Sequence, residues 1–402
     1  MKRLASAFPA VLFLFAGATG LFAQSSGPTQ PTSSEQLAIY EINRARANPQ
    51  KYDTEKGLGG ALAGVAAQQP LAVNLNLTNS SRFHSTEFGT YGYFDHQSAI
   101  TGTWPNKMAR NAGYSLPNPP YVDNDNFIES IAAVGSSGGG ASYAPADAIR
   151  ALILDAGVST LGHRIHLLAM NSSSQAFREV GTGYATGKRW DLAAAYPSPA
   201  PNPPAGSGAY WTIHTGVRAA SKPFLTGIVY NDANSNGRFD LNEGVSGVTV
   251  YAWQGSGVPL ATTTNSGGGW AIEVLAGTWG VTAYGGSFGG PKYAQVTVSA
   301  SNIAVDFRSN SDTVDVNFGG PSGGTGTWGI LPGSATQDGS SKPATAYDPT
   351  GSGGGGGGSG STGTGGGGGG GCASGDAPSW ALLALAALAL LVMWRRSAAQ
   401  RS

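Results

Sequence analysis

The chain has 402 residues, with 23 Lys and Arg against 23 Asp and Glu and a formal net charge of +0 at pH 7. Charged residues make up only 11% of the chain and form no basic cluster longer than a dipeptide, which excludes nucleic acid as an expected partner because phosphate binding needs concentrated Lys and Arg. A single cysteine excludes an intramolecular disulfide.

Residues 1–23 predict a secretory signal peptide. Lys2 and Arg3 precede an apolar stretch that ends in small residues, which is the three-part layout of such peptides. Cleavage after Ala23 is preferred, and Ala16 and Ala18 offer a more regular A-x-A alternative. We therefore expect an exported protein.

Residues 33–219 predict a first compact domain. An opening helix is expected over 33–48, where Ser33 and Gln36 form a capping box and Pro49 stops the helix. Further helical segments are expected at 71–87, 146–155 and 162–170, and strands at 178–187 and 210–217. Helices followed by a late hairpin predict an α+β domain with layered packing.

Residues 224–319 predict a second, all-β domain. Short β-forming runs alternate with turns, as in a small sandwich of the Ig or prealbumin type. Residues 320–371 are dominated by Gly, Ser, Thr and Pro, a composition typical of a disordered, flexible linker.

The last segment, residues 372–402, predicts a membrane partner. The apolar run 380–394 would form one transmembrane helix of about 22 Å, shorter than the ~30 Å of bilayer hydrocarbon, and Arg395 and Arg396 should stay on the cytoplasmic side. The sequence leaves open whether this helix persists in the mature protein. Cys372, between the glycine run and the helix, is a candidate for processing or lipidation.

Residues 232–243 predict a calcium site. The segment DANSNGRFDLNE fits the pattern D-x-[DN]-x-[DN]-G-x5-E, which sets oxygen ligands around Ca²⁺. The expected ligands are Asp232, Asn234, Asn236, the carbonyl of Arg238, Asp240 and Glu243. Because β-forming runs rather than helices flank the loop, we expect the ion to clamp the sandwich. The alternative is an Asn/Asp turn that only resembles the pattern.

All five histidines lie between residues 80 and 215, so any metal or catalytic chemistry is expected there. His163 and His166 are three residues apart and would share one face of a helix. We assign His84, His166, His214 and Glu179 chiefly to structure.

The order of short motifs over residues 35–217 resembles the CAP (SCP-like) superfamily in its bacterial form. The motifs are Ile42-Asn43 with Arg46, YFDHQS, ARNAGY, FIESI, DAGVSTLGHR, EVGTGY and YWTIHTG. The resemblance implies an α-β-α sandwich with a cleft where histidines and acids hold zinc (Zn²⁺) or another divalent cation. By position it assigns His96, Glu129 and His163, with Asp155 as the candidate second acid; Ser130 stands where the family usually has Asn.

Two more resemblances cover the rest of the chain. Residues 224–319 resemble the calcium-binding B-type domains of serine-aspartate repeat (Sdr) adhesins. The order of glycine run, Cys372, apolar helix and two arginines resembles sorting signals of the myxosortase type, which implies a sorting protease as partner.

These features predict an extracellular protein anchored at the cell surface or outer membrane. As a binding module it would recognise a lipid, a glycan or a protein through a cleft with a divalent metal. One alternative is a metal-dependent hydrolase acting on peptide or cell-wall material, and another is a structural envelope protein or adhesin. A further alternative to the enzymatic interpretation is that the same side chains form a hydrogen-bonded polar cluster that stabilises the cleft, without turnover.

Overall fold

The computed structural model describes residues 30–191, 201–255, 257–317 and 335–350. The chain divides into two compact units, Met1–Gly353 and Gly354–Ser402, and the second lies outside the described residues. The predicted signal peptide, Cys372 and the predicted helix 380–394 also lie outside them.

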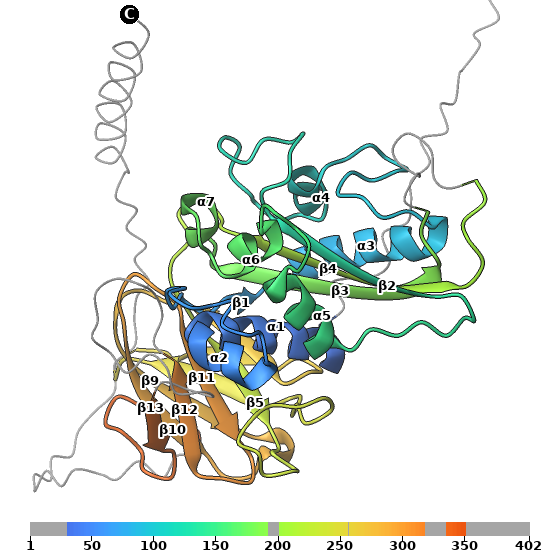
Figure 1. Ribbon diagram of the computed structural model, residues 1–402. Helices are drawn as coiled ribbons and strands as arrows, with labels where there is room; N and C mark the ends of the chain where they lie inside the picture. Colours follow the sequence, from blue (N-terminus) through green and yellow to red (C-terminus); the bar gives the residue numbers. More distant parts are fainter. Residues whose placement is uncertain (1–29, 192–200, 256, 318–334, 351–402) are drawn as a thin grey trace, which may run out of the picture. The chain divides into compact units, whose positions relative to one another are not determined.

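The first part of the chain holds seven described helices and a four-stranded sheet (Figure 1). The sheet has the order β1-β3-β4-β2, with β3 and β2 antiparallel to β4 and β1 parallel to β3. Helix α3 packs on one face, and α1 and α5 lie on the other. The bounds are α1 (Ser33–Ala47), α2 (Pro49–Lys56), β1 (Ala72–Val73), α3 (Leu75–Tyr91), α4 (Pro105–Asn111), β2 (Glu129–Ser136), α5 (Pro145–Leu154), α6 (Gly162–Leu167), α7 (Ser172–Gln175), β3 (Glu179–Lys188) and β4 (Ser207–Gly216).

The capping box of α1 lies one residue earlier than predicted. The Thr32 backbone N–H donates to Glu35 Oε2 at 2.8 Å, and the Glu35 N–H donates to Thr32 Oγ1 at 3.3 Å. Asn48 ends α1 and its side chain caps α2, whose first residue is Pro49. The proline therefore starts a second helix immediately after the first.

Close contact between α3 and β3 depends on two glycines. A Cβ at Gly181 would lie 2.0 Å from the Thr78 backbone nitrogen, and one at Gly183 would lie 2.3 Å from that of Arg82. The helix also donates hydrogen bonds to the strand, since Ser81 Oγ bonds the Gly181 carbonyl at 3.0 Å. This contact holds α3 directly over the sheet.

The second part of the chain forms a β-sandwich. Its two sheets have the orders β10-β9-β6-β7 and β13-β12-β11-β5-β8, and apolar side chains from both fill one core. The bounds are β5 (Phe224–Tyr230), β6 (Thr249–Trp253), β7 (Leu260–Thr263), β8 (Gly269–Glu273), β9 (Gly277–Tyr284), η1 (Gly286–Phe288), β10 (Lys292–Val298), β11 (Ile303–Arg308), β12 (Thr313–Asn317) and β13 (Ala335–Asp338). Strand β13 lies inside the segment 320–371, for which composition predicts a linker, and pairs with β12.

Helix α1 contributes to two hydrophobic clusters of the first unit, the core beneath the first sheet and a smaller cluster against the sandwich part. Ile39 and Ile42 pack in the core beneath the first sheet. Tyr40 packs with Tyr230 and Phe239 of the sandwich part. The predicted domains 33–219 and 224–319 therefore share a continuous interface within residues 1–353.

The predicted fold class is wrong. The chain is a mixed α/β structure with 27% strand and 24% helix, richer in β-structure than the expected α-β-α sandwich. The excess comes in part from strands β2 and β13, which the sequence patterns did not predict. Of the helices within the described ranges, none has both the length and the apolar character needed to span a membrane.

Candidate metal centre

Strands β2 and β4 and helix α3 bring histidines to one buried carboxylate. Glu129 is the first residue of β2 and lies opposite His214 of β4. Opposite residues of paired strands project to the same face, and here that face is covered by α3, which carries His84. His96 reaches the same carboxylate from the loop after α3. Glu129, His84 and His214 are all buried.

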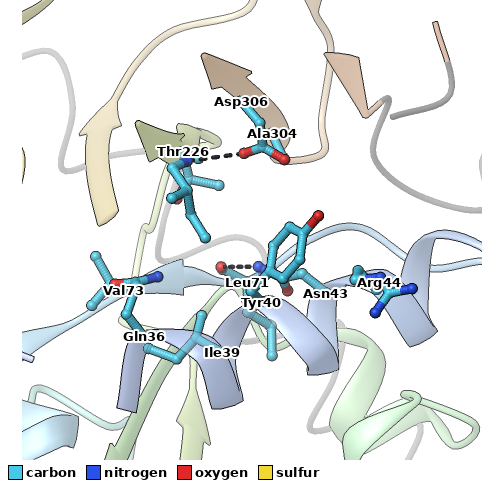
Figure 2. A pocket seen from close by; sticks show the side chains of 12 residues that line it. Gln36, Ile39, Tyr40, Asn43, Arg44, Leu71, Val73, Thr226, Ala304 and Asp306 are labelled. Carbon is cyan, nitrogen blue, oxygen red and sulfur yellow. Dashed lines mark hydrogen bonds between the residues drawn. The ribbon is translucent and has the colours of Figure 1, made fainter. Parts of the chain in front are cut away.

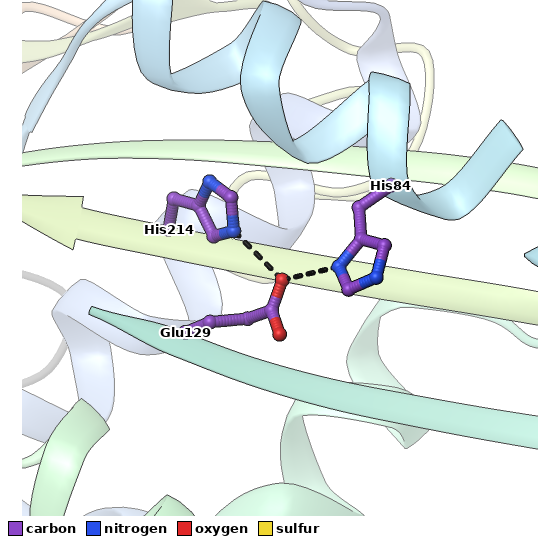
Figure 3. A group of neighbouring side chains, drawn as sticks. All are labelled: His84, Glu129 and His214. Atoms are coloured by element: carbon purple, nitrogen blue, oxygen red, sulfur yellow. Dashed lines mark hydrogen bonds and ion pairs between the residues drawn. The ribbon is translucent and has the colours of Figure 1, made fainter. Parts of the chain in front are cut away.

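Glu129 accepts hydrogen bonds from three imidazoles. Its Oε2 accepts from His84 Nδ1 at 2.6 Å and from His214 Nε2 at 2.8 Å (Figure 3). Its Oε1 accepts from His96 Nδ1 at 2.7 Å. Asn126 Oδ1 accepts the Glu129 backbone N–H at 2.9 Å, which fixes the start of the strand.

The surroundings keep this carboxylate ionised. Burial raises the pKa of Glu129, but the charge of His84 and the hydrogen bonds from the three imidazoles outweigh burial and hold the pKa well below its usual range. An ionised carboxylate only accepts hydrogen bonds, so each imidazole nitrogen that faces it carries a proton. His96 is therefore protonated at Nδ1, and its Nε2 is the nitrogen available to a ligand.

Burial and Glu129 act in opposite directions on the histidines. Burial lowers the pKa of His96, but the hydrogen bond and the charge of Glu129 exceed this effect, so the pKa is raised. In His214 burial prevails over the same carboxylate and lowers the pKa. His214 is fully buried, whereas the His96 side chain is 34% exposed.

The group His84, Glu129 and His214 can hold a metal ion. One ligand atom from each residue lies within 4.8 Å of the others. However, a tetrahedral zinc ion with bonds of about 2.0–2.1 Å sets its ligand atoms about 3.3 Å apart. The N–O distances of 2.6 and 2.8 Å are those of hydrogen bonds, so an ion could enter only if these side chains separated and lost the bonding protons.

A second imidazole–carboxylate pair lies between α5 and α6. Asp155 follows α5 in the left-handed conformation, with φ 52°, and its Oδ2 accepts the His163 backbone N–H at 3.0 Å. Its Oδ1 accepts from His163 Nδ1 at 2.8 Å. The carboxylate therefore fixes both the start of α6 and the orientation of the His163 ring.

His96 and His163 line one cavity of about 410 Å³. Their ring centroids are 6.5 Å apart. Within the described part of the chain, neither Nε2 atom has a hydrogen-bond partner. Two imidazoles, each held at Nδ1 by a carboxylate, thus share a solvent-connected space through their remaining nitrogens.

No family model matches this chain. No curated protein matches it either. Among solved structures, a DUF3823 family protein from Parabacteroides merdae is 13% identical with a TM-score of 0.17. The match covers 26% of this chain and 62% of that chain, so this chain spans less than two thirds of its length. A likeness at that TM-score carries no argument about fold or function.

The cavity brings together three of the four residues assigned to a metal by position. His96, Glu129 and His163 line it, while Asp155 does not and instead holds His163. The structure adds His84 and His214, which the sequence assigned to structure. The pairing of β2 with β4 reveals their contact with Glu129, and no local sequence pattern marks it.

His166 also lines this cavity but has a structural role. Its Nδ1 bonds Ser130 Oγ at 2.7 Å and its Nε2 bonds Thr215 Oγ1 at 2.6 Å, so both nitrogens are satisfied. Burial lowers the pKa of His166 to about 3, which keeps the ring neutral. Glu179 likewise bonds Tyr114, at 2.9 Å, and Arg218 away from this centre.

The predicted calcium loop lies between β5 and β6. Asp232 Oδ1 accepts the Asn236 N–H at 3.0 Å, and Oδ2 accepts the Gly237 N–H at 2.9 Å. Glu243 accepts the backbone N–H of Ala233 at 2.9 Å. Gly237 has φ 76°, a left-handed conformation that glycine adopts without strain at the sharp turn. The loop is therefore closed on itself at both ends.

The middle of this loop gathers the remaining expected ligands. Asp240 Oδ2 accepts from Asn234 Nδ2 at 2.7 Å and from Asn236 Nδ2 at 2.6 Å. Oxygen atoms of carboxylates and amides are the ligands that Ca²⁺ prefers, and the two amides would turn their oxygens inward to bind it. The Arg238 side chain points away and donates to Glu55 of α2 at 2.6 Å, which leaves its carbonyl for the loop.

Proposed function

We propose that this protein is an exported, surface-anchored binding module in which His96 and His163 hold a divalent cation at the cavity wall. One observation carries the proposal: two imidazoles in the same cavity are each held at Nδ1 by a carboxylate, and neither Nε2 has a hydrogen-bond partner among the residues that the structure describes. Metal-binding histidines usually donate their other ring nitrogen to a carboxylate or carbonyl in this way, which fixes the tautomer and the ring orientation.

Zinc is the cation that this donor set favours. Imidazole nitrogen suits Zn²⁺, and two protein ligands leave coordination positions for an oxygen of a bound partner molecule. When bound, the ion supplies Lewis acidity at this point. The chain orients the two ligands, because Glu129 and Asp155 prevent the rings of His96 and His163 from turning away.

The cavity wall favours an uncharged or weakly charged ligand. Its other polar groups include Thr160, Asn171 and Ser173, and its apolar groups include Phe127 and Val158. No Lys or Arg occurs among the described residues that line it, so within this part of the chain an anion would be neutralised only by the metal itself. A glycan, a lipid or a polar protein segment remains the proposed class of ligand.

Metal analysis tests this proposal. Purified full-length chain, equilibrated with one equivalent of Zn²⁺ and desalted, should retain about one ion, and the double variant H96A/H163A should retain none. Thr160→Ala is the matched control, because this residue lines the same cavity but offers no nitrogen. Equal metal content in the wild type and the double variant, with both folded, would refute the site.

A hydrolase is the second candidate, because the same open coordination positions would accept a water molecule. Wild type and H96A/H163A should then differ in hydrolysis across a panel of peptide and cell-wall substrates. Equal rates would remove this alternative and leave the binding module.

The proposal includes a calcium ion in the loop 232–243. It is supported by the twelve-residue pattern and by the convergence of the Asp232, Asp240 and Glu243 side chains on that loop. Export, processing near Cys372 and anchoring through residues 380–394 rest on sequence pattern alone and complete the proposal.

A further inference from the structure

Only one of the three imidazoles that contact Glu129 lines the cavity. His96 does, whereas His84 and His214 are 0% exposed and do not. Their hydrogen bonds to Oε2 of Glu129 must therefore act through that carboxylate.

We infer that His84 and His214 are positioning residues that hold Glu129 so that it orients His96, and that they are not ligands of the ion. The inference rests on the proposed function, in which His96 Nε2 binds the cation. A carboxylate exchanges its oxygens by rotation about the Cγ–Cδ bond. Two donors on Oε2, one from α3 and one from β4, oppose that rotation, and Oε1 stays directed at His96 Nδ1.

His214 is itself held on its far side. Its Nδ1 bonds Ser80 Oγ at 2.9 Å, and its backbone N–H donates to Ser81 Oγ at 3.2 Å. The Ser80 contact fixes the ring so that Nε2 and its proton face Glu129. Helix α3 and strand β4 are thus linked through the same imidazole.

Within the described part of the chain, the His84 ring forms a hydrogen bond at Nδ1 only. Its Nε2 is buried with no hydrogen-bond partner in the described part of the chain, and its ring packs 4.2 Å from the Phe88 ring and 6.1 Å from that of Tyr93. An unsatisfied buried nitrogen is destabilising, a cost that a phenyl ring would not carry at this apolar site. The hydrogen bond to Glu129 is what this histidine provides.

Substitutions of His84 and His214 that keep or remove the hydrogen-bond donor to Glu129 distinguish a positioning role from a role as a metal ligand. His84→Asn places an amide N–H near the position of the His84 Nδ1, and His214→Gln places one near the position of the His214 Nε2, but an amide is a poor zinc ligand. His84→Asn and His214→Gln keep the donor, whereas His84→Leu and His214→Leu remove it. Glu87→Gln is the matched control, since Glu87 is buried on α3 and bonds Tyr93 and Ser98 rather than Glu129.

Two measurements on the full-length chain decide the inference. The first is the Kd for Zn²⁺, from competition with a chromophoric chelator. We expect the donor-keeping variants and the control to stay within about threefold of wild type, and the leucine variants to bind about 10- to 100-fold more weakly. The second is the His96 tautomer in the metal-free protein, from ¹⁵N NMR of labelled histidine. It should be the Nδ1–H form in wild type and mixed in the leucine variants.

The zinc affinities and the His96 tautomer of these variants distinguish positioning from ligation. If His84→Asn and His214→Gln lose zinc as completely as His96→Ala, both residues are ligands and the inference is overturned. It is also overturned if the leucine variants keep wild-type affinity and a single tautomer. If the leucine variants do not fold, the donor-keeping pair still decides between ligation and positioning. If wild type binds no zinc, the proposed function fails, and the tautomer measurement alone decides the role of His84 and His214.

Discussion

Asp306 on β11 provides a sharp test of the electrostatics of the sandwich. Its Oδ1 accepts the Ile228 N–H at 2.9 Å, and its side chain faces a small cavity of about 20 Å³ beside α1 (Figure 2). Tyr40 and Arg44 line the same cavity from α1, and Asp315 lies opposite on β12. Burial, with the negative charge of Asp315, raises the pKa of Asp306 to about 7.

The raised pKa of Asp306 predicts the sign and the size of the change in the free energy of unfolding with pH. The ordinary pKa of an aspartate side chain is 3.8. Between pH 3.8 and about pH 7, the folded chain therefore keeps a proton at Asp306 that the unfolded chain has lost. The free energy of unfolding falls as the pH rises through this range. At about 1.4 kcal/mol for each pH unit, the difference corresponds to at most about 4 kcal/mol above pH 7. Asp306→Asn removes this loss, because an amide keeps the acceptor for Ile228 and has no charge.

Urea denaturation of wild type and D306N from pH 4 to pH 8 measures the effect. The two free energies of unfolding should be similar near pH 4, and the variant should become increasingly more stable up to about pH 7. Asp312→Asn removes a carboxylate from an exposed position on the turn before β12 and should show no such divergence. A difference between wild type and D306N that stays constant with pH, or that favours wild type as pH rises, would refute the argument.

Three further changes test other parts of the fold. Gly181→Ala would place a Cβ 2.0 Å from the Thr78 nitrogen and should lower the free energy of unfolding by about 2–3 kcal/mol in urea titrations. Phe239→Ala removes a ring that packs 5.6 Å from the Tyr40 ring, with an expected loss of about 3–5 kcal/mol; unchanged stability would contradict a core shared with α1. Calcium at 100-fold above its Kd should stabilise wild type by about 2.7 kcal/mol, and Glu243→Gln should remove that gain; a variant that retains it would exclude Glu243 as a ligand.

Helix boundaries were predicted within a few residues where local signals are strong. The opening helix, the helix ending near 155 and the strands near 179–188 and 207–216 all follow from caps, prolines and side-chain periodicity. Strand β2 was missed because its first four residues, Glu-Ser-Ile-Ala, are all buried, so polar and apolar side chains do not alternate along it. Strand β13 was missed because its surroundings have the composition of a linker.

The sequence by itself determined features that depend on neighbouring residues. The calcium pattern is confined to twelve consecutive residues, and the signals for α1 lie within its own first and last turns. His96, Glu129 and His163 were selected by the order of short motifs, which identifies residues without placing them in space.

Only the tertiary structure decided how those residues meet. The register of β2 against β4 sets His214 opposite Glu129, 85 positions away, and the contact of α3 with the sheet adds His84. It also decided that Asp155 supports His163 rather than facing the cavity. Such pairings depend on which strands lie side by side and in which register, and this follows from burial of the whole core rather than from the spacing of any two residues.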